Sequence, residues 1–263
     1  MQNIQHNYVI SLTTATDRRE HITKEFGKQN ITFEFFDAIT PNNLELKAKE
    51  LGIDISNSPL TKGEIACALS HIALYYLAKE KELDYICIFE DDIYLGENAN
   101  LLLNNNNYID DNVDIVKIEK NFDTVILSVF SIKEYLGRKF YKLTKSNSGT
   151  GGYIVTKKGI DFLVKNIKEI KDIEIDNLLF KQLLLKKEYT VWQMQPAVCI
   201  QDCLLNPQTS SFGVMGGEGG ERDQRRDKKN KKKLPLIIRL VKEVKRPFAK
   251  LNKKFFGKKA YFK

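Results

Sequence analysis

YICIFEDDI (85–93) is the stretch that decides the fold: an apolar, β-favouring run leads directly into Glu90, Asp91 and Asp92. A continuous apolar run of this kind is typical of a strand covered on both faces, as in a parallel sheet. Ligands of open α/β sheets bind beyond the carboxyl ends of such strands. Adjacent carboxylates repel one another unless a cation or water compensates them, so the triplet indicates either a metal site or an exposed acidic turn.

Strand and helix patterns alternate on both sides of this stretch. Strands are predicted at residues 8–12, 32–39, 113–118, 139–144, 152–156 and 189–194, and helices at 17–26, 62–80, 157–168 and 174–187. Thr61 and Glu64 form a capping-box pattern at the start of the helix 62–80. The alternation predicts an α/β domain with a mixed, mainly parallel sheet.

The charge of the chain is unevenly distributed. The whole chain of 263 residues has a net charge of +8. Residues 221–263 contain 18 Lys and Arg against 4 Asp and Glu, which leaves 24 against 30 for residues 1–220. A mildly acidic body followed by a strongly basic end predicts that the end binds a polyanion, either nucleic acid or an anionic membrane surface.

We expect the body to occupy residues 1–212. The glycine-rich and then highly charged residues 213–233 predict a linker, because glycine leaves little side-chain packing to fix the backbone. Residues 234–263 place apolar residues on one helical stripe and basic residues opposite, with Pro247 interrupting the helix. This pattern is typical of a helix lying in a membrane interface; the alternative is that its apolar stripe packs on the body. Few aromatic residues are interleaved among the lysines, so nucleic acid is not expected as a partner.

Targeting signals are also missing from the sequence. No apolar run approaches the ~18 residues of a membrane span, and the N-terminal MQNIQHNYVI lacks the regions of a signal peptide. Four cysteines, two of them in apolar segments, fit reduced thiols better than a disulfide framework. We therefore expect a cytoplasmic protein.

Glu90 and Asp92 form an acidic-x-acidic pair. Two carboxylates at a strand end bind Mg²⁺ or Mn²⁺ together with nucleotide phosphates, because hard cations prefer oxygen ligands and take some from the substrate. The chain contains neither a GxxxxGK[ST] loop nor a GxGxxG after the first strand, so the sequence does not support a P-loop or a standard dinucleotide site. A diphosphate held by a metal is the interpretation that remains.

The chain resembles the bacterial lipooligosaccharide galactosyltransferases of glycosyltransferase family 25 over about residues 8–212. The segments that carry the resemblance, in order and spacing, are YVISLTTATDRREHI (8–22), LTKGEIACALSHIALY (60–75), YICIFEDDI (85–93) and GTGGYIVTKKGIDFL (149–163). The resemblance implies a GT-A-type fold, UDP-galactose as donor, Mn²⁺ or Mg²⁺ as cofactor, inversion at the sugar carbon, and a β-linked product, expected to be β-1,4. The implied acceptor is a lipid-linked oligosaccharide, which places the enzyme peripherally on the inner face of the inner membrane. The alternative is transfer of another UDP-hexose, glucose or N-acetylhexosamine, on the same fold.

The resemblance makes the acidic triplet a DxD-type motif. Asp92 is predicted to contact the metal, Asp91 the metal or the ribose, and Glu90 the nucleotide through a hydrogen bond.

An inverting transfer also needs a carboxylate that takes the proton of the attacking acceptor hydroxyl. Asp176 is the first candidate, with Glu174 and Asp202 behind it. The alternative for Asp176 is an acidic residue that only stabilises a helix N-terminus.

Further candidates surround the donor. Arg18 and Arg19 are predicted to bind the uracil or the phosphates, unless they lie on a solvated helix face. His71 is predicted either to organise the donor site or to be a satisfied core histidine. Gly151 and Gly152 are predicted to let the backbone approach the donor galactose closely, although they also fit an ordinary turn into a strand.

Overall fold

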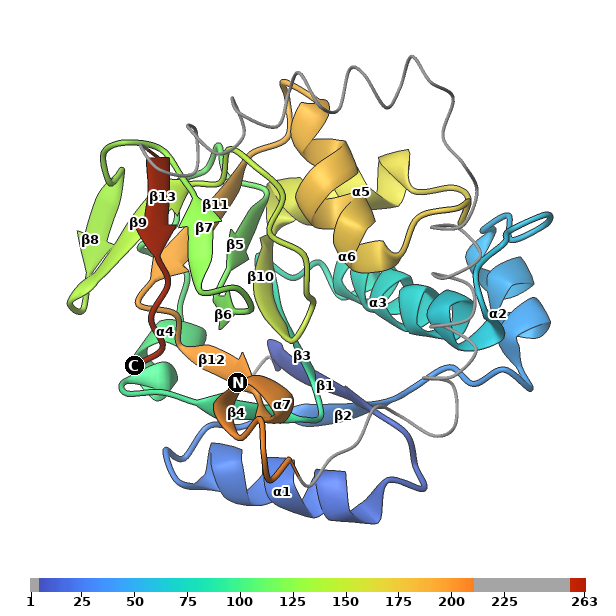
Figure 1. Cartoon of the computed structure of the whole chain (residues 1–263). Coiled ribbons are helices and arrows are strands. Elements are labelled where there is room, and N and C mark those ends of the chain that lie inside the picture. The colour runs from blue at the N-terminus through green and yellow to red at the C-terminus, as the bar shows by residue number, and fades with distance from the viewer. Residues whose placement is uncertain (1–4, 211–255) are drawn as a thin grey trace.

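The computed structural model describes residues 5–210 and 256–263. The predicted linker, residues 213–233, and most of the predicted tail, residues 234–263, lie outside the described residues. Within the described ranges the chain forms an α/β body (Figure 1).

Most of the predicted elements are present, with ends shifted by a few residues. The strands of the large sheet are β1 (Asn7–Ser11), β2 (Glu34–Asp37), β3 (Tyr85–Glu90), β5 (Ile115–Lys117), β8 (Lys133–Tyr135), β9 (Arg138–Lys142), β10 (Gly152–Thr156) and β11 (Val191–Gln195). Two smaller sheets consist of β4 (Ile93–Leu95), β6 (Glu119–Lys120) and β12 (Cys199–Gln201), and of β7 (Thr124–Ile126) and β13 (Gly257–Lys259). The helices are α1 (Thr16–Gly27), α2 (Leu44–Leu51), α3 (Lys62–Glu80), α4 (Ala99–Leu103), α5 (Lys157–Asn166), α6 (Ile175–Asn177) and α7 (Asp202–Leu205).

The large sheet has the strand order β2-β1-β3-β10-β5-β11-β9-β8. It is mixed, as predicted, but the prediction that it is mainly parallel is wrong. β1 pairs in parallel with β2 and β3, and β11 with β5. The other pairings are antiparallel, because β10 runs in the opposite direction between β3 and β5, and the β8–β9 hairpin continues antiparallel from β11. The carboxyl ends of β1, β2 and β3 and the start of β10 therefore lie at one edge.

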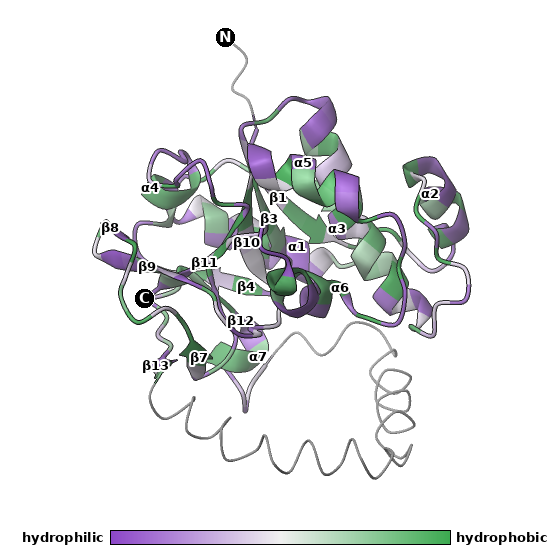
Figure 2. Ribbon diagram, turned by 90° about the horizontal axis from the view of Figure 1, so that it is seen from above, coloured by the Kyte–Doolittle hydropathy of each residue, from purple (hydrophilic) through white to green (hydrophobic). Residues whose placement is uncertain are grey.

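The central strands bury both of their faces. Tyr8 and Ile10 of β1 pack in the core under α3 and α5, whereas Val9 packs in the core under α1 and α4. Figure 1 shows α1 on one side of these strands and α3 with α5 on the other, and Figure 2 shows the apolar strands β1 and β3 inside the molecule. The prediction that residues 85–89 form a strand covered on both faces is confirmed.

Helix α3 begins with the predicted capping box. The Glu64 amide donates to Thr61 Oγ1 at 3.2 Å, and the Thr61 amide donates to Glu64 Oε2 at 2.9 Å. Two backbone amides at the start of the helix are therefore hydrogen-bonded. Further along the helix, His71 lies next to Glu90 of the acidic motif.

Helical turns occupy residues 175–185, where a helix was predicted over 174–187, but they do not form one regular α-helix. The chain instead forms α6, a wide π-helical turn η1 (Leu178–Gln182) and a 3₁₀ turn η2 (Leu183–Leu185). Phe180 leaves the helical conformation, with φ −107° and ψ 15°, and its side chain is fully buried against Tyr153. Tertiary packing of Phe180 thus overrides the local helical pattern.

The last eight residues return to the body. β13 pairs antiparallel with β7, and Ala260 is buried. The buried Arg138 guanidinium donates to the backbone oxygen of Lys263 at 2.5 Å and to that of Glu97 at 2.7 Å. Residues 256–263 therefore pack on the body, although the sequence placed them in the tail. None of the helices in the described ranges is long and apolar enough to cross a membrane.

Candidate active site

The acidic motif lies where β3 ends, and its carboxylates have different surroundings. Asp91 is fully buried. Its Oδ1 accepts from Arg18 Nη1 at 2.6 Å, and its Oδ2 accepts from Ser11 Oγ at 2.7 Å. Because both oxygens are engaged, the geometry favours Asp91 as the residue that orients Arg18 rather than as a metal ligand, the role predicted for it as one of two options.

Glu90 and Asp92 are partly exposed and share one amide donor. Gln201 Nε2 lies 3.0 Å from Glu90 Oε2 and 3.3 Å from Asp92 Oδ1. Burial raises the pKa of Asp92 to about 7, and the neighbouring charge of Glu90 adds to this rise. Burial also raises the pKa of Glu90, but the nearby His71, the hydrogen bond from Thr150 and the charge of Lys117 outweigh burial, and the net pKa lies below its usual value.

These two carboxylates fit a divalent cation. Burial and the nearby charge of Glu90 disfavour the ionised form of Asp92 and so raise its pKa, whereas a bound cation would favour that form. In the part of the chain that the structure describes, no three His, Cys, Asp or Glu side chains are grouped to hold a metal. A cation at Asp92 and Glu90 would thus take further oxygen ligands from a substrate, as Mg²⁺ and Mn²⁺ commonly do.

His71 is a buried residue that faces the motif with one nitrogen. Its Nδ1 is hydrogen-bonded to the Tyr153 hydroxyl at 2.8 Å, and that hydroxyl is hydrogen-bonded to Tyr75 Oη at 2.7 Å. Its Nε2 has no hydrogen-bond partner and lies 3.8 Å from Glu90 Oε1. His71 therefore belongs to the core, although its Nε2 is not hydrogen-bonded as a satisfied core histidine would be, and its role in organising a donor site stays a prediction.

The glycine loop that precedes β10 borders Glu90 directly. The Glu90 amide donates to the Gly151 oxygen at 3.2 Å, and Thr150 Oγ1 donates to Glu90 Oε1 at 2.5 Å. A Cβ added at Gly152 would lie 2.2 Å from Cys199 Sγ, and one at Gly151 would lie 2.7 Å from Glu119 Oε1. The glycines are therefore required for close packing against the sheet β4-β12-β6, while their approach to a sugar stays a prediction.

Asp176 lies beside the same loop. Its Oδ2 accepts from the Gly149 amide at 3.1 Å, and its Oδ1 accepts from the Asn177 amide at 2.6 Å. The side chain is partly exposed, so molecules in solution can reach it. The tertiary structure thus brings Asp176 to the loop that borders Glu90, although the two residues are far apart in sequence.

The two other candidates for the base differ in access. Glu174 precedes α6, is partly exposed, and lines a groove of about 290 Å³ together with Asn177 and Lys181. Asp202 is buried, and its oxygens accept from Asn206 Nδ2 and Ser210 Oγ. The geometry therefore does not favour Asp202 as a base; its backbone amide instead donates to the backbone oxygen of Asp92 at 2.7 Å.

Arg19 has a different place from Arg18. Its guanidinium donates to the backbone oxygens of Ser11 and Leu12, forms an ion pair with Asp37, and lies over the Phe35 ring. These contacts tie together the ends of β1 and β2. These contacts give Arg19 a structural role. Donor binding by Arg19 remains a prediction.

Sequence reasoning missed several residues of the site. Lys117 and Glu119 are two apart on an extended segment, a spacing that places side chains on one face, and this signal was available. Gln201 ends the short strand β12, whose carboxyl end meets the motif. Its polar character alone did not distinguish it from a surface residue.

The site can be compared with known proteins. Residues 4–179 match the model of glycosyltransferase family 25 (LPS biosynthesis protein). A predicted glycosyltransferase of Haemophilus influenzae (strain Rd) is 44% identical, covering 98% of this chain and 89% of that protein. The lipooligosaccharide biosynthesis protein lic2B of Haemophilus influenzae is 37% identical over 77% of this chain and 78% of that protein.

Two further proteins are more distant. The lacto-N-neotetraose biosynthesis glycosyltransferase LgtB of Neisseria meningitidis serogroup B is 35% identical over 74% of this chain and 75% of that protein. A solved glycosyltransferase involved in the glycosylation of the major capsid of PBCV-1 covers 84% of this chain and 97% of that chain, at 9% identity and a TM-score of 0.32. The last likeness is too weak to carry an argument.

Proposed function

The chain belongs to glycosyltransferase family 25, a family of LPS biosynthesis proteins, and from this membership we propose that it transfers galactose from UDP-galactose to a hydroxyl of a lipooligosaccharide sugar. The proposed product is β-linked, at the 4-position, and the proposed fold type is GT-A. Two of the related proteins, lic2B and LgtB, are named for lipooligosaccharide or lacto-N-neotetraose biosynthesis, which supports the acceptor class.

The observation that carries the proposal is the position of Glu90 and Asp92 at one edge of the sheet. Both are partly exposed, share the Gln201 amide, and lie next to the glycine loop. Two carboxylates of this kind suit a divalent cation that also binds a diphosphate. Such a cation, Mn²⁺ or Mg²⁺, would neutralise charge on the UDP leaving group.

The chain's own residues supply the remaining chemistry. Arg18, held by Asp91, places a fixed positive charge at the end of β1, where it suits a phosphate or the uracil carbonyls. Asp176 takes the proton of the acceptor hydroxyl as that oxygen attacks the sugar carbon from the side opposite UDP. Attack from the opposite side converts the α-linked donor into a β-linked product.

The experiment is a donor panel offered with truncated lipooligosaccharide acceptors. UDP-galactose, UDP-glucose and UDP-N-acetylhexosamines are supplied in turn with Mn²⁺, and products are identified by mass spectrometry and linkage analysis. Galactose transfer that stops in excess EDTA supports the proposal. Transfer of another hexose selects the alternative donor, and full activity in EDTA removes the metal from the mechanism.

Membrane attachment is the remaining part of the proposal. The basic end of the chain would hold the enzyme at the anionic inner face of the inner membrane, where a lipid-linked acceptor lies. Of the predicted tail, only residues 256–263 are described, and they pack on the body. Binding of duplex DNA with an affinity similar to that for anionic vesicles would favour the nucleic-acid alternative.

A further inference from the structure

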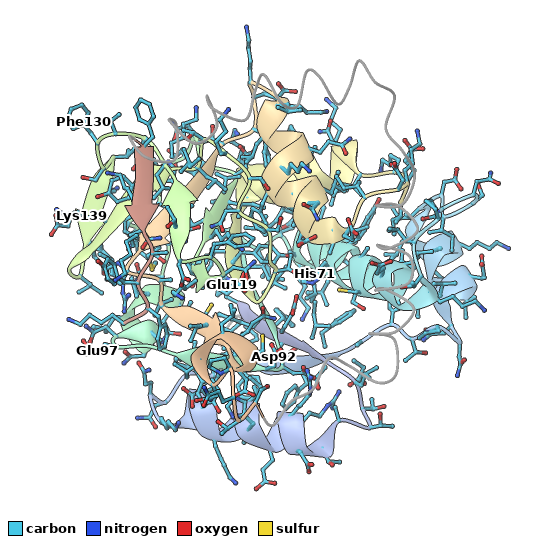
Figure 3. The ribbon with its side chains drawn as sticks, viewed as in Figure 1. His71, Asp92, Glu97, Glu119, Phe130 and Lys139 are labelled. Atoms are coloured by element: carbon cyan, nitrogen blue, oxygen red, sulfur yellow. The ribbon has the colours of Figure 1, made fainter. Side chains whose placement is uncertain are left out.

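Exposed apolar residues lie on the connection between β7 and β8 and just before β13, apart from the acidic motif in sequence. They are Val129, Phe130, Ile132 and Phe256, with exposed fractions of 55%, 82%, 46% and 45%. Figure 3 shows Phe130 at the outer edge of the molecule, away from His71 and Glu119 in the interior. We call these four residues the Phe130 patch.

The backbone under the Phe130 patch is fixed. The Ser128 amide donates to the Lys142 oxygen at 2.9 Å, and the Ile132 amide donates to the Phe140 oxygen at 2.7 Å. Lys258 Nζ donates to the Val129 oxygen at 3.1 Å. Because residues of β9 and β13 hydrogen-bond to the backbone of this connection, its position is fixed while its apolar side chains are exposed to solvent.

Phe256 joins the patch from the other end of the chain. It immediately precedes Gly257, which pairs with Ile126 at the end of β7. The antiparallel register therefore directs Phe256 toward the residues that follow Ile126, which lead into Val129. Two segments distant in sequence thus lie side by side where these exposed apolar residues occur.

Cationic residues lie on the same segments as the patch. Residues 124–145 and 256–263 contain 8 Lys and Arg, of which Arg138 is buried, and a single acidic side chain, Glu134. Lys139 and Lys142 on β9 are exposed, and Lys258 lies over the Tyr141 ring at 4.8 Å. Figure 3 places Lys139 at the same outer edge as Phe130.

The chain between the described ranges adds to this charge by its sequence. Residues 211–255 contain 15 Lys and Arg against 5 Asp and Glu. Phe256, which belongs to the patch, follows this segment directly in sequence. The most basic part of the sequence is therefore joined directly to the exposed apolar residues.

We propose that the Phe130 patch inserts into the interface of an anionic lipid bilayer, with the lysines of the same segments bound to lipid headgroups. Apolar side chains flanked by basic residues bind such interfaces through buried apolar area and through attraction to anionic lipids. The proposal concerns a surface of the body, and it stands whichever sugar the enzyme transfers.

The test uses the full chain and vesicles of phosphatidylcholine alone or with phosphatidylglycerol. In one variant Val129, Phe130 and Ile132 are all changed to Ser. We expect it to bind anionic vesicles at least ~10-fold more weakly than the wild type in co-sedimentation, because the apolar area available for burial is lost. Leu185→Ser is the matched control, since Leu185 is 84% exposed on η2 and its change should leave binding unaltered.

A second variant reports insertion directly. The chain has one tryptophan, Trp192, which is 2% exposed, so Phe130→Trp adds an exposed fluorophore. Its emission should shift to the blue and be quenched by brominated lipids in anionic vesicles, whereas Leu185→Trp should not respond. Lys139→Glu with Lys142→Glu should weaken binding at 0.1 M salt and make little difference at 0.5 M.

Other occupants of the patch give distinct results. Equal vesicle binding by the triple Ser variant and the wild type overturns the proposal. Emission of Phe130→Trp that is already blue-shifted without vesicles shows that the chain itself covers the patch, which also overturns it. A dimer that dissociates in the triple Ser variant identifies a second copy as the partner instead.

Discussion

Lys117 and Glu119 form an ion pair that is fully buried beneath the glycine loop, with Lys117 Nζ 2.7 Å from Glu119 Oε2. The ammonium also donates to the Gly149 oxygen and lies 4.4 Å from the centre of the Phe180 ring. Burial raises the pKa of Glu119, and the charge of Lys117 partly offsets that rise. The pair therefore supports the loop that borders Glu90 and depends on both partners being present.

Lys117→Met should destabilise the protein by about 3–5 kcal/mol, because it leaves Glu119 buried without its counter-charge. Urea unfolding measures the change. Adding Glu119→Gln should recover part of the loss. Lys79→Met is the control, because Lys79 pairs with Asp161 at the surface and should cost less than about 1 kcal/mol. A small effect of Lys117→Met would show that the pair is dispensable.

Asp92→Asn should reduce transfer at least ~10²-fold and weaken Mn²⁺ binding, because it removes the carboxylate best placed to hold a cation. Calorimetric titration of Mn²⁺ with UDP measures binding separately from rate. Asp84→Asn is the matched control, since Asp84 is exposed and lies just before the opposite end of the same strand β3. Unchanged Mn²⁺ affinity in Asp92→Asn would contradict the assignment.

Asp176→Asn should lower kcat by ~10²–10⁴ while donor binding is retained, because a general base acts on the acceptor proton and not on the donor. Glu174→Gln serves as the comparison on the same segment. Asp202→Asn should mainly lower the unfolding temperature, since Asp202 accepts from Asn206 and Ser210. A wild-type rate in Asp176→Asn would transfer the role to Glu174.

Gly152→Ala should destabilise the protein by about 1–3 kcal/mol, because the new Cβ would lie 2.2 Å from Cys199 Sγ. Thermal unfolding measures the loss. Adding Cys199→Ala removes the sulfur and should restore part of the stability. Gly27→Ala is the control, since its Cβ would meet nothing within 4 Å. No rescue by Cys199→Ala would mean that the strain lies elsewhere.

Removing residues 257–263 should destabilise the body by a few kcal/mol, because β13 is lost and Arg138 loses its contact with the Lys263 oxygen. Lys263→Ala keeps that backbone oxygen and should stay within about 0.5 kcal/mol of the wild type. Equal unfolding curves for the truncated and full chains would show that the docked end adds no stability.

The sequence by itself determined the parts of this protein that depend on local patterns. Hydrophobic periodicity located most helices and strands, and the capping box at Thr61 located the start of α3. The apolar run 85–89 and the carboxylates that follow it located the site, because a strand buried on both faces and a polar turn after it are both readable from neighbouring residues. The ordered set of four segments pointed to the family that the comparisons identify.

Only the tertiary structure decided which side chains meet. The Asp91 carboxylate accepts hydrogen bonds from Ser11 and Arg18. Asp176 accepts one from the Gly149 amide, and β13 pairs with β7. No local pattern contains these contacts, because each joins residues separated by many positions. The direction of β10 and the interruption at Phe180 have the same origin. Strand order and core packing depend on which distant residues are buried against one another, and these contacts form only when the whole chain folds.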